Sequence, residues 1–300
     1  MSMEYFIITV YCLIDELLKK QIGNDKLRKR GFNPALSDSE VITMEIIAEF
    51  LGIDTDKGAW EYFCNHWRSW FPAIGSRANF AKHAANLWVI KQQMQKELAI
   101  QLGAFSDSLH MADGFPMPVC HFKRANFSQV FSGEAGYGYC ASKGETYDGF
   151  KGNVLINSDG IITEITATRA NIDERESLWD LLGGIHGMVI ADKGLIGADY
   201  QNELLRCANI NLQTAVRSNM EENRSPKFLK WLVSTRRLIE TVIGQLTERF
   251  KIEKVRARKL WYLTNRIARK VLAHTICICI NKKMGNPALQ FDLLVFQSAQ

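Results

Sequence analysis

Residues 187–194, which read GMVIADKG, constrain the fold of this chain more than any other stretch. Four apolar residues carry no charge, and the run stops abruptly at Asp192. Such a run is typical of a strand that is buried on both faces, as in a parallel sheet covered by helices. Because ligands bind at the carboxyl ends of strands in such sheets, Asp192 is a candidate functional carboxylate. The alternative is that Asp192 caps a helix that follows Gly194.

Sequence patterns on both sides of this stretch predict a mixed sheet. A strand at 109–113 also ends in an aspartate, Asp113, and we expect Pro116 and Pro118 to prevent a longer strand. Residues 122–148 are rich in glycine, tyrosine and serine, and we expect them to be irregular. The remaining pattern predicts strands at 151–157 and 161–168 joined by an Asp-Gly turn, a helix at 174–182, a strand at 187–192, a helix at 198–208, a strand at 210–216 and a helix at 230–250. This order of elements is that of a ribonuclease H-like α/β fold.

Residues 1–104 predict only helices, with a break at 31–34. The predicted helices span residues 4–20, 37–51, 59–71 and 76–102. Ser37 and Glu40 form a capping box at the start of the second helix, and Ser76 caps the fourth. Arg77, Lys82 and His83 make the opening of the fourth helix basic, which suits a helix that reads DNA. The alternative is a helical domain that only packs or dimerises.

These patterns divide the chain into three parts. We expect an all-helical N-terminal domain over 1–104 and a catalytic domain over 105–257, in which helices flank a mixed sheet. A basic helical segment over 258–300 is expected to pack on the catalytic core. Residues 1–18 are apolar but carry Glu4, Asp15 and Glu16, so we expect neither a signal peptide nor a membrane span, and a cytoplasmic protein.

Positive charge is concentrated near the C-terminus. The net charge is only +5, but residues 249–283 hold eleven Lys and Arg against one acid, Glu253, so this segment is +10 and the rest of the chain is −5. Such asymmetry indicates a polyanion bound on one side. The alternative is a solvated charged surface. The seven cysteines are scattered without a CxxC pair, which indicates reduced thiols rather than a zinc site.

A third acid, Glu240, lies in the helix predicted at 230–250. Helical spacing places Arg236, Arg237, Glu240 and Gly244 on one face. An ordinary ion pair between Glu240 and Arg236 is the alternative to a functional role. With Asp113 and Asp192, Glu240 completes a set of three carboxylates. Such a set favours hard divalent cations, here Mg²⁺ or Mn²⁺, and two ions about 3.5–4 Å apart suit phosphoryl transfer.

Four motifs give the chain a family resemblance: LSDSEVIT at 36–43, ADGFP at 112–116, ADKG at 191–194 and RRLIET at 236–241. On these motifs the chain resembles the DDE transposases of bacterial insertion sequences, most closely the group numbered 982. The resemblance implies a ribonuclease H-like core in which Asp113, Asp192 and Glu240 form the metal-binding triad with two ions. It also implies cleavage and joining of DNA at terminal inverted repeats.

The partners that follow are double-stranded DNA, both repeats and target, and further copies of the chain in a homodimer or higher oligomer on DNA. Seven basic residues are the candidate DNA contacts: Arg77, Lys82, Arg236, Arg237, Arg256, Arg258 and Lys259. Of these, Arg236 and Arg237 are expected beside the scissile phosphate. Two other functions remain open: a metal-dependent nuclease or resolvase without strand transfer, and an inactive copy that represses by binding DNA.

Overall fold

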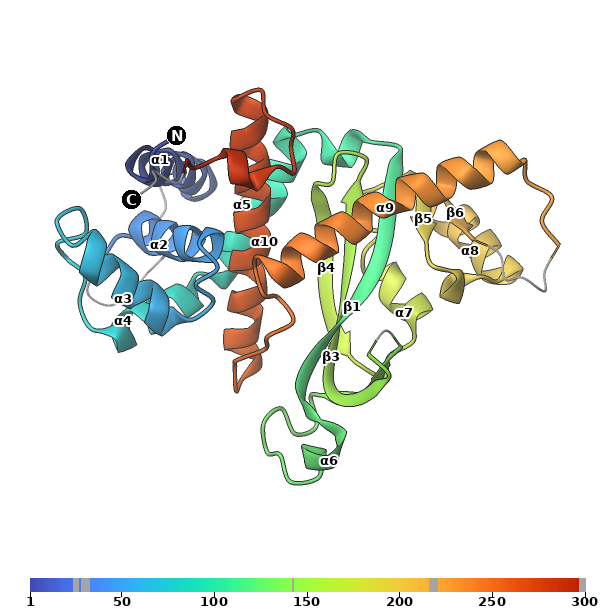
Figure 1. The fold of residues 1–300 in the computed structure, drawn as a ribbon, viewed down its shortest axis with the longest axis horizontal. Helices are drawn as coiled ribbons and strands as arrows, with labels where there is room; N and C mark the ends of the chain where they lie inside the picture. Colours follow the sequence, from blue (N-terminus) through green and yellow to red (C-terminus); the bar gives the residue numbers. More distant parts are fainter. Residues whose placement is uncertain (24–26, 28–32, 142, 216–220, 297–300) are drawn as a thin grey trace. The chain divides into compact units, whose positions relative to one another are not determined.

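The computed structural model describes the chain except for residues 24–26, 28–32, 142, 216–220 and 297–300 (Figure 1). The chain forms two compact units. The helical unit comprises Met1–Leu98, Leu246–Ile252 and Arg256–Gln300, and the sheet unit comprises Ala99–Gln245 and Glu253–Val255. No helix among the described residues is long and apolar enough to cross a membrane.

In the helical unit, the sequence correctly predicted where several helices begin. Its elements are α1 (Met3–Ile22), α2 (Asp38–Phe50), α3 (Asp56–His66), α4 (Arg77–Asn86), most of α5 (Trp88–Gln101), α10 (Leu260–Lys283) and the short η3 (Phe291–Leu293). The capping box is confirmed, because Ser37 Oγ accepts from the Glu40 amide at 3.2 Å and Glu40 Oε2 accepts from the Ser37 amide at 2.6 Å. The cap at Ser76 is confirmed as well. Half of the expected break at 31–34 lies outside the described residues.

Two expected helices are wrong in extent. The helix expected at 59–71 begins earlier, at Asp56, and ends at His66. The single helix expected at 76–102 is two helices, because the chain leaves helical geometry at Leu87, whose amide donates to the Ala84 carbonyl. Leu87 is buried. The apolar spacing continues through this break, so the sequence pattern does not reveal it.

The C-terminal helix α10 belongs to the helical unit, together with α2 and α4. That residues 258–300 also pack on the catalytic core stays a prediction. The physical reason for the packing of α10 in the helical unit is charge pairing: Glu49 of α2 accepts from Arg269 Nε and from Lys270 Nζ, each at 2.6 Å. Both cations are buried, so part of the basic segment serves packing.

The sheet unit contains all described strands. Its elements are η1 (Ala104–Ser106), β1 (Leu109–His121), α6 (Phe122–Ala125), β2 (Gly136–Cys140), β3 (Glu145–Asn157), β4 (Ile162–Arg169), α7 (Glu174–Trp179), β5 (Gly187–Ala191), η2 (Lys193–Leu195), α8 (Ala198–Ala208), β6 (Ile210–Thr214) and most of α9 (Pro226–Glu248). The predicted helices at 174–182, 198–208 and 230–250 correspond to α7, α8 and α9. The last residue of the strand predicted at 210–216 lies outside the described residues.

The described strands form one mixed sheet in the order β2-β3-β1-β5-β6, with β4 beside β3 (Figure 1). Strands β1, β5 and β6 are parallel, whereas β3 runs antiparallel to β1 and to β4. The turn from β3 to β4 uses Gly160 at φ +79°, as its Asp-Gly sequence predicts. Strand β5 lies between two parallel neighbours, which confirms that residues 187–191 form an interior strand.

Strand β1 is much longer than expected, and the prediction that Pro116 and Pro118 stop it is wrong. Strand β5 pairs with β1 only over Leu109–Met111, so beyond that point one side of β1 has no β5 partner. Proline is tolerated along such an edge because its missing N–H leaves no ladder bond broken. The region expected to be irregular also contains a short strand, β2, which pairs with the first part of β3.

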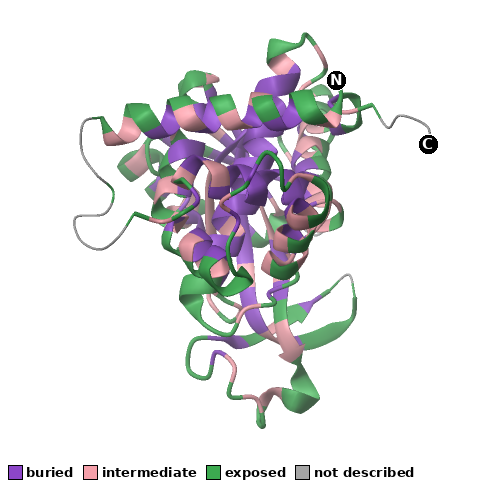
Figure 2. Cartoon of the chain, turned by 90° about the vertical axis from the view of Figure 1, so that its left-hand side faces the viewer, coloured by how far each residue is buried: buried purple, intermediate pink, exposed green. Residues whose placement is uncertain are grey.

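Helices cover the two faces of the sheet differently. Helices α7 and α8 pack on one face through a buried cluster that includes Leu155, Leu178, Val189 and Leu204. Helix α9 reaches the other face, where Arg236 contacts Asp113. Figure 2 shows the buried residues in purple along the strands and on the inner sides of the helices. The sheet edge where β1 and β5 diverge is therefore bordered by helices from both faces.

Candidate active site

The two aspartates predicted from the strand ends lie at one position of the sheet. Met111 of β1 pairs with Ile190 of β5, and this is the last pair between these parallel strands. Asp113 and Asp192 each follow two residues later, so the register places them side by side. Because β5 ends at Ala191 while β1 continues, the carboxylates lie where the sheet opens.

Arg236 of helix α9 joins the two carboxylates. Its Nη2 donates to Asp113 Oδ2 at 2.9 Å and lies 3.3 Å from Asp192 Oδ1. The structure thus brings together three of the predicted site residues: the carboxylates of Asp113 and Asp192 and the guanidinium of Arg236. The ion pair between Arg236 and Glu240, offered as the alternative role for Glu240, is not among the ion pairs of the described residues.

The side chain of Asp192 is not used as a helix cap. The short helix η2 begins directly after it, at Lys193, without a side-chain capping bond. Asp113 also keeps one oxygen close to the backbone, since its Oδ1 accepts from the Gly114 amide at 2.8 Å. The carboxylate of Asp192 is therefore left for a cation, which favours its functional role over the capping role.

Electrostatics at this position favour a bound cation. Burial raises the pKa of Asp113 above its ordinary value, the Arg236 guanidinium opposes that rise, and the negative charge of Asp192 adds to it. Two adjacent carboxylates repel each other when both are ionised, and a positive charge between them relieves the repulsion. Arg236 supplies that charge here.

The remaining predicted acid, Glu240, is not joined to this pair. It lies one helical turn beyond Arg236 on α9 and is exposed. In the part of the chain that the structure describes, no three His, Cys, Asp or Glu side chains are grouped so that they could hold a metal ion. The membership of Glu240 in the site stays a prediction.

The predicted DNA contacts outside the carboxylate pair are mostly exposed. Arg77, Lys82, Arg237, Arg258 and Lys259 are all exposed. Arg256 is also exposed, but its Nη1 donates to Asp54 at 2.9 Å.

The expectation that the whole 249–283 segment faces a polyanion needs correction. Arg266, Arg269 and Lys270 are buried in the helical unit, so they cannot form part of a surface. Buried charges must be paired, and α2 supplies the acid for two of them.

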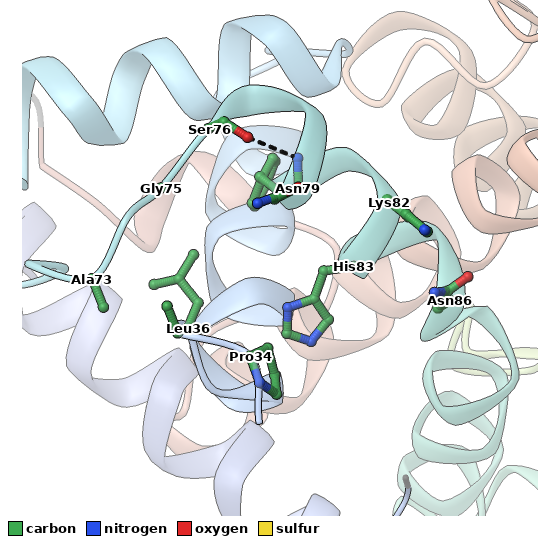
Figure 3. Close-up of a pocket in the computed structure, with 11 residues that line it drawn as sticks. Pro34, Leu36, Ala73, Gly75, Ser76, Asn79, Lys82, His83 and Asn86 are labelled. Atoms are coloured by element: carbon green, nitrogen blue, oxygen red, sulfur yellow. Dashed lines mark hydrogen bonds between the residues drawn. The ribbon is translucent and has the colours of Figure 1, made fainter. Parts of the chain in front are cut away.

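Helix α4 borders a hollow in the helical unit. A cavity of about 660 Å³ lies between residues 34–36, residues 73–76 and one side of α4 (Figure 3). Asn79, Lys82, His83 and Asn86 of α4 line it, and His83 pairs with Asp38 at 2.5 Å. Arg77 does not line it, so the two predicted basic residues of α4 do not share this hollow.

Sequence reasoning missed two charged residues beside the carboxylates. Lys151 of β3 and Glu174 of α7 form an ion pair and line a cavity of about 30 Å³ together with Asp113 and Asp192. A lysine at a strand start and a glutamate at a helix start are ordinary surface features in a sequence. The only available signal was the period-two alternation of β3, which puts Lys151 on the same face as the core residue Leu155.

The part of the chain that holds this site matches a known family. Two adjacent carboxylates at the opening of a mixed sheet are groups that could hold a hard divalent cation. The family model described as "Transposase DDE domain" matches residues 104–260, which is more than half of the chain. The chain therefore belongs to the DDE transposases. No curated protein matches it.

Proposed function

We propose that this chain is an insertion-sequence transposase, of the kind represented by the 982 group, that cleaves and joins DNA at terminal inverted repeats. The observation that carries the proposal is the pair of aspartates, Asp113 within β1 and Asp192 directly after β5, which lie side by side where these parallel strands separate, share contact with Arg236 and fall inside the matched DDE domain. The strand order supports a ribonuclease H-like core, because three antiparallel strands, β4, β3 and β1, are followed by the parallel strands β5 and β6.

The residues present suit a divalent metal ion. Arg236 contacts both carboxylates, so Asp113 and Asp192 are close enough to share one positive charge. Asp113 and Asp192 would hold Mg²⁺ or Mn²⁺, with Glu240 as the third acid of a two-ion site. Bound ions would activate the attacking oxygen and stabilise the leaving oxygen of the phosphodiester.

The chain's own residues then orient the DNA. In this proposal the scissile phosphate is bound by Arg236, which reaches the carboxylate pair, and by its exposed neighbour Arg237. Guanidinium groups bind phosphate oxygens in a fixed, bidentate geometry, so these two arginines position the strand for in-line attack. First water, and then the freed 3′-hydroxyl, would attack at the same site.

In this proposal residues 105–257 form the catalytic domain. Residues 1–104 recognise the terminal repeats, and residues 258–300 add contacts to the phosphate backbone of the DNA. We also propose that the active form on DNA is a homodimer or higher oligomer, because two element ends must be processed together.

A supercoiled plasmid that carries the flanking terminal repeats tests this function. We expect incubation with the full chain and Mg²⁺ to release the repeat ends and join them to new sites, as seen by sequencing the products. Cleaved ends without joined products would instead indicate a nuclease or resolvase. DNA binding without cleavage would indicate a repressor.

The exposed part of the basic segment provides a first prediction. Replacing Arg258 and Lys259 together by alanine should weaken binding about equally for repeat DNA and random duplex, because phosphate contacts carry no sequence information. Each lost contact should lower the slope of log affinity against log salt by roughly 0.9. Filter binding over a salt series measures this. The control replaces Lys19 and Lys57, which are exposed lysines of α1 and α3. If the Arg258 and Lys259 variant loses affinity for repeat DNA only, then Arg258 or Lys259 reads bases.

Helix α4 provides a second prediction. Replacing Arg77 and Lys82 by alanine in the full chain should reduce the preference for terminal repeats over random duplex, by about 1–3 kcal/mol for each lost base contact. Competition binding measures the preference. The full chain is required because a fragment of residues 105–300 would separate α10 from its buried partners on α2. An unchanged preference would assign recognition of the ends to another region.

A further inference from the structure

The ion pair of Lys151 with Glu174 lies against the carboxylates. Lys151 and Glu174 line the 30 Å³ cavity together with Asp113 and Asp192. The Lys151 side chain is 20% exposed and that of Glu174 is 46% exposed, so the ammonium is the more enclosed of the two groups. The ammonium of Lys151 therefore lies close to the two carboxylates at which the proposed phosphoryl transfer takes place.

The strand register explains how Lys151 reaches the site. Lys151 lies opposite Pro116 of β1, and Asn153 lies opposite Gly114. Directly opposed residues share a face, so Lys151 projects on the face covered by α7, whereas Asp113 pairs with Val154 on the other face. Arg236 and Lys151 thus approach the carboxylates from opposite faces of the sheet.

The glycines of both aspartate motifs make room for this ion pair. A Cβ on Gly114 would lie 2.8 Å from Lys151 Cε, and one on Gly194 would lie 2.7 Å from Glu174 Oε2 and 4.0 Å from Asp192 Oδ2. Neither Gly114 nor Gly194 has a positive φ, so backbone conformation does not require glycine at either position. What these two glycines provide is space, and Lys151 and Glu174 occupy it.

The size of the cavity limits what the ammonium could bind. A cavity of about 30 Å³ has room for a water-sized group and not for a nucleotide. One non-bridging oxygen of a phosphodiester is such a group. A lysine ammonium has three donors, so Lys151 can keep its bond to Glu174 and still donate to a phosphate oxygen.

We propose that Lys151 binds a non-bridging oxygen of the reacting phosphate, and that Glu174 is a positioning residue that holds its ammonium at the cavity. This inference rests on the proposed transposase function, because it needs a phosphodiester at the carboxylate pair. Arg236 and Lys151 then hold the phosphate from the two faces of the sheet.

Single-turnover cleavage of repeat DNA by full-length variants tests the proposal. Lys151→Met should slow cleavage by about 10²–10³-fold, as expected for losing one donor to the charge that develops in the transition state. Lys151→Arg should restore most of the rate, because it keeps the charge. Glu174→Gln should slow cleavage less and raise its sensitivity to salt, since the ammonium is then less firmly held.

Lys143→Met is the matched control. Lys143 also pairs with a glutamate in the sheet unit, Glu253, at 3.2 Å, and it does not line the cavity. We expect this variant to cleave at the wild-type rate. Cleavage by Lys151→Met at the wild-type rate would overturn the proposal while leaving the transposase function intact.

A second measurement does not depend on cleavage. Acetylation of lysines, quantified by mass spectrometry with and without repeat DNA, should show protection of Lys151 by DNA and no protection of Lys143. If DNA protects Lys151 from acetylation but the protein never cleaves the DNA, the transposase function would be contradicted and the phosphate contact supported. Equal acetylation of Lys151 with and without bound DNA would overturn the contact.

Discussion

Replacing Asp113 or Asp192 by asparagine is expected to abolish cleavage of terminal-repeat DNA while leaving DNA binding and the fold intact. An amide has nearly the shape of a carboxylate but is a far poorer ligand for a hard cation. Loss of metal stabilisation is worth several kcal/mol in the transition state, which corresponds to a rate reduction of about 10³-fold or more. Single-turnover cleavage with Mg²⁺, alongside thermal melting and gel-shift binding, measures all three properties.

Two further variants sharpen this test. Asp199→Asn changes an exposed acid on α8 in the same unit and should cleave normally. Glu240→Gln should also abolish cleavage if Glu240 joins the two aspartates when metal and DNA are bound. Glu240 is exposed, and the described residues contain no group of three side chains that could hold a metal ion. The Glu240→Gln variant therefore decides whether Glu240 belongs to the active site. Near wild-type cleavage by any of the three acid variants would remove that residue from the site.

The sheet and its two aspartates were predictable because their signals are local. An uncharged run between glycines can only be a buried strand or a short buried helix, and the Asp-Gly turn fixes the hairpin before it. The structure confirms β5 as an interior strand and brings Asp113 and Asp192 to one position. Once β1 and β5 pair in parallel, their register brings the two aspartates to one position of the sheet.

Features that depend on tertiary partners could not be read in the same way. Proline at 116 was expected to end β1, yet the strand continues because its neighbour β5 has already separated from it. The ion pair of Lys151 and Glu174 depends on how α7 packs on β3, which neither segment encodes alone. The basic stretch looked like one charged surface in the sequence. In the structure much of α10 is buried, so Arg266, Arg269 and Lys270 lie inside the helical unit, whereas Arg258 and Lys259 are exposed.

The buried charges of the helical unit form a cluster centred on Glu49. Glu49 accepts from Arg269 and Lys270, and the neighbouring Glu45 of α2 pairs with Lys91. All five side chains are at most 2% exposed. Burial lowers the pKa of Lys270 to about 8, against the opposing effect of Glu49, so the ammonium depends on that carboxylate to stay charged. The cluster ties α10 to α2 through charges that have no access to water.

Glu49→Leu is therefore expected to destabilise the helical unit by about 3–5 kcal/mol, because it leaves the buried ammonium of Lys270 without its acid. It also removes one of three acids from Arg269, which keeps its ion pairs with Glu45 and Asp56. The apolar side chain fills much of the same volume, so a cavity contributes little to this loss. Chemical denaturation followed by tryptophan fluorescence measures the change. Glu61→Leu, which removes an exposed ion pair with Lys57 on α3, should cost less than about 1 kcal/mol. Similar free energies of unfolding for the two variants would mean that Lys270 finds another partner or water, and that the ion pair of Lys270 with Glu49 is not needed to hold α10 on α2.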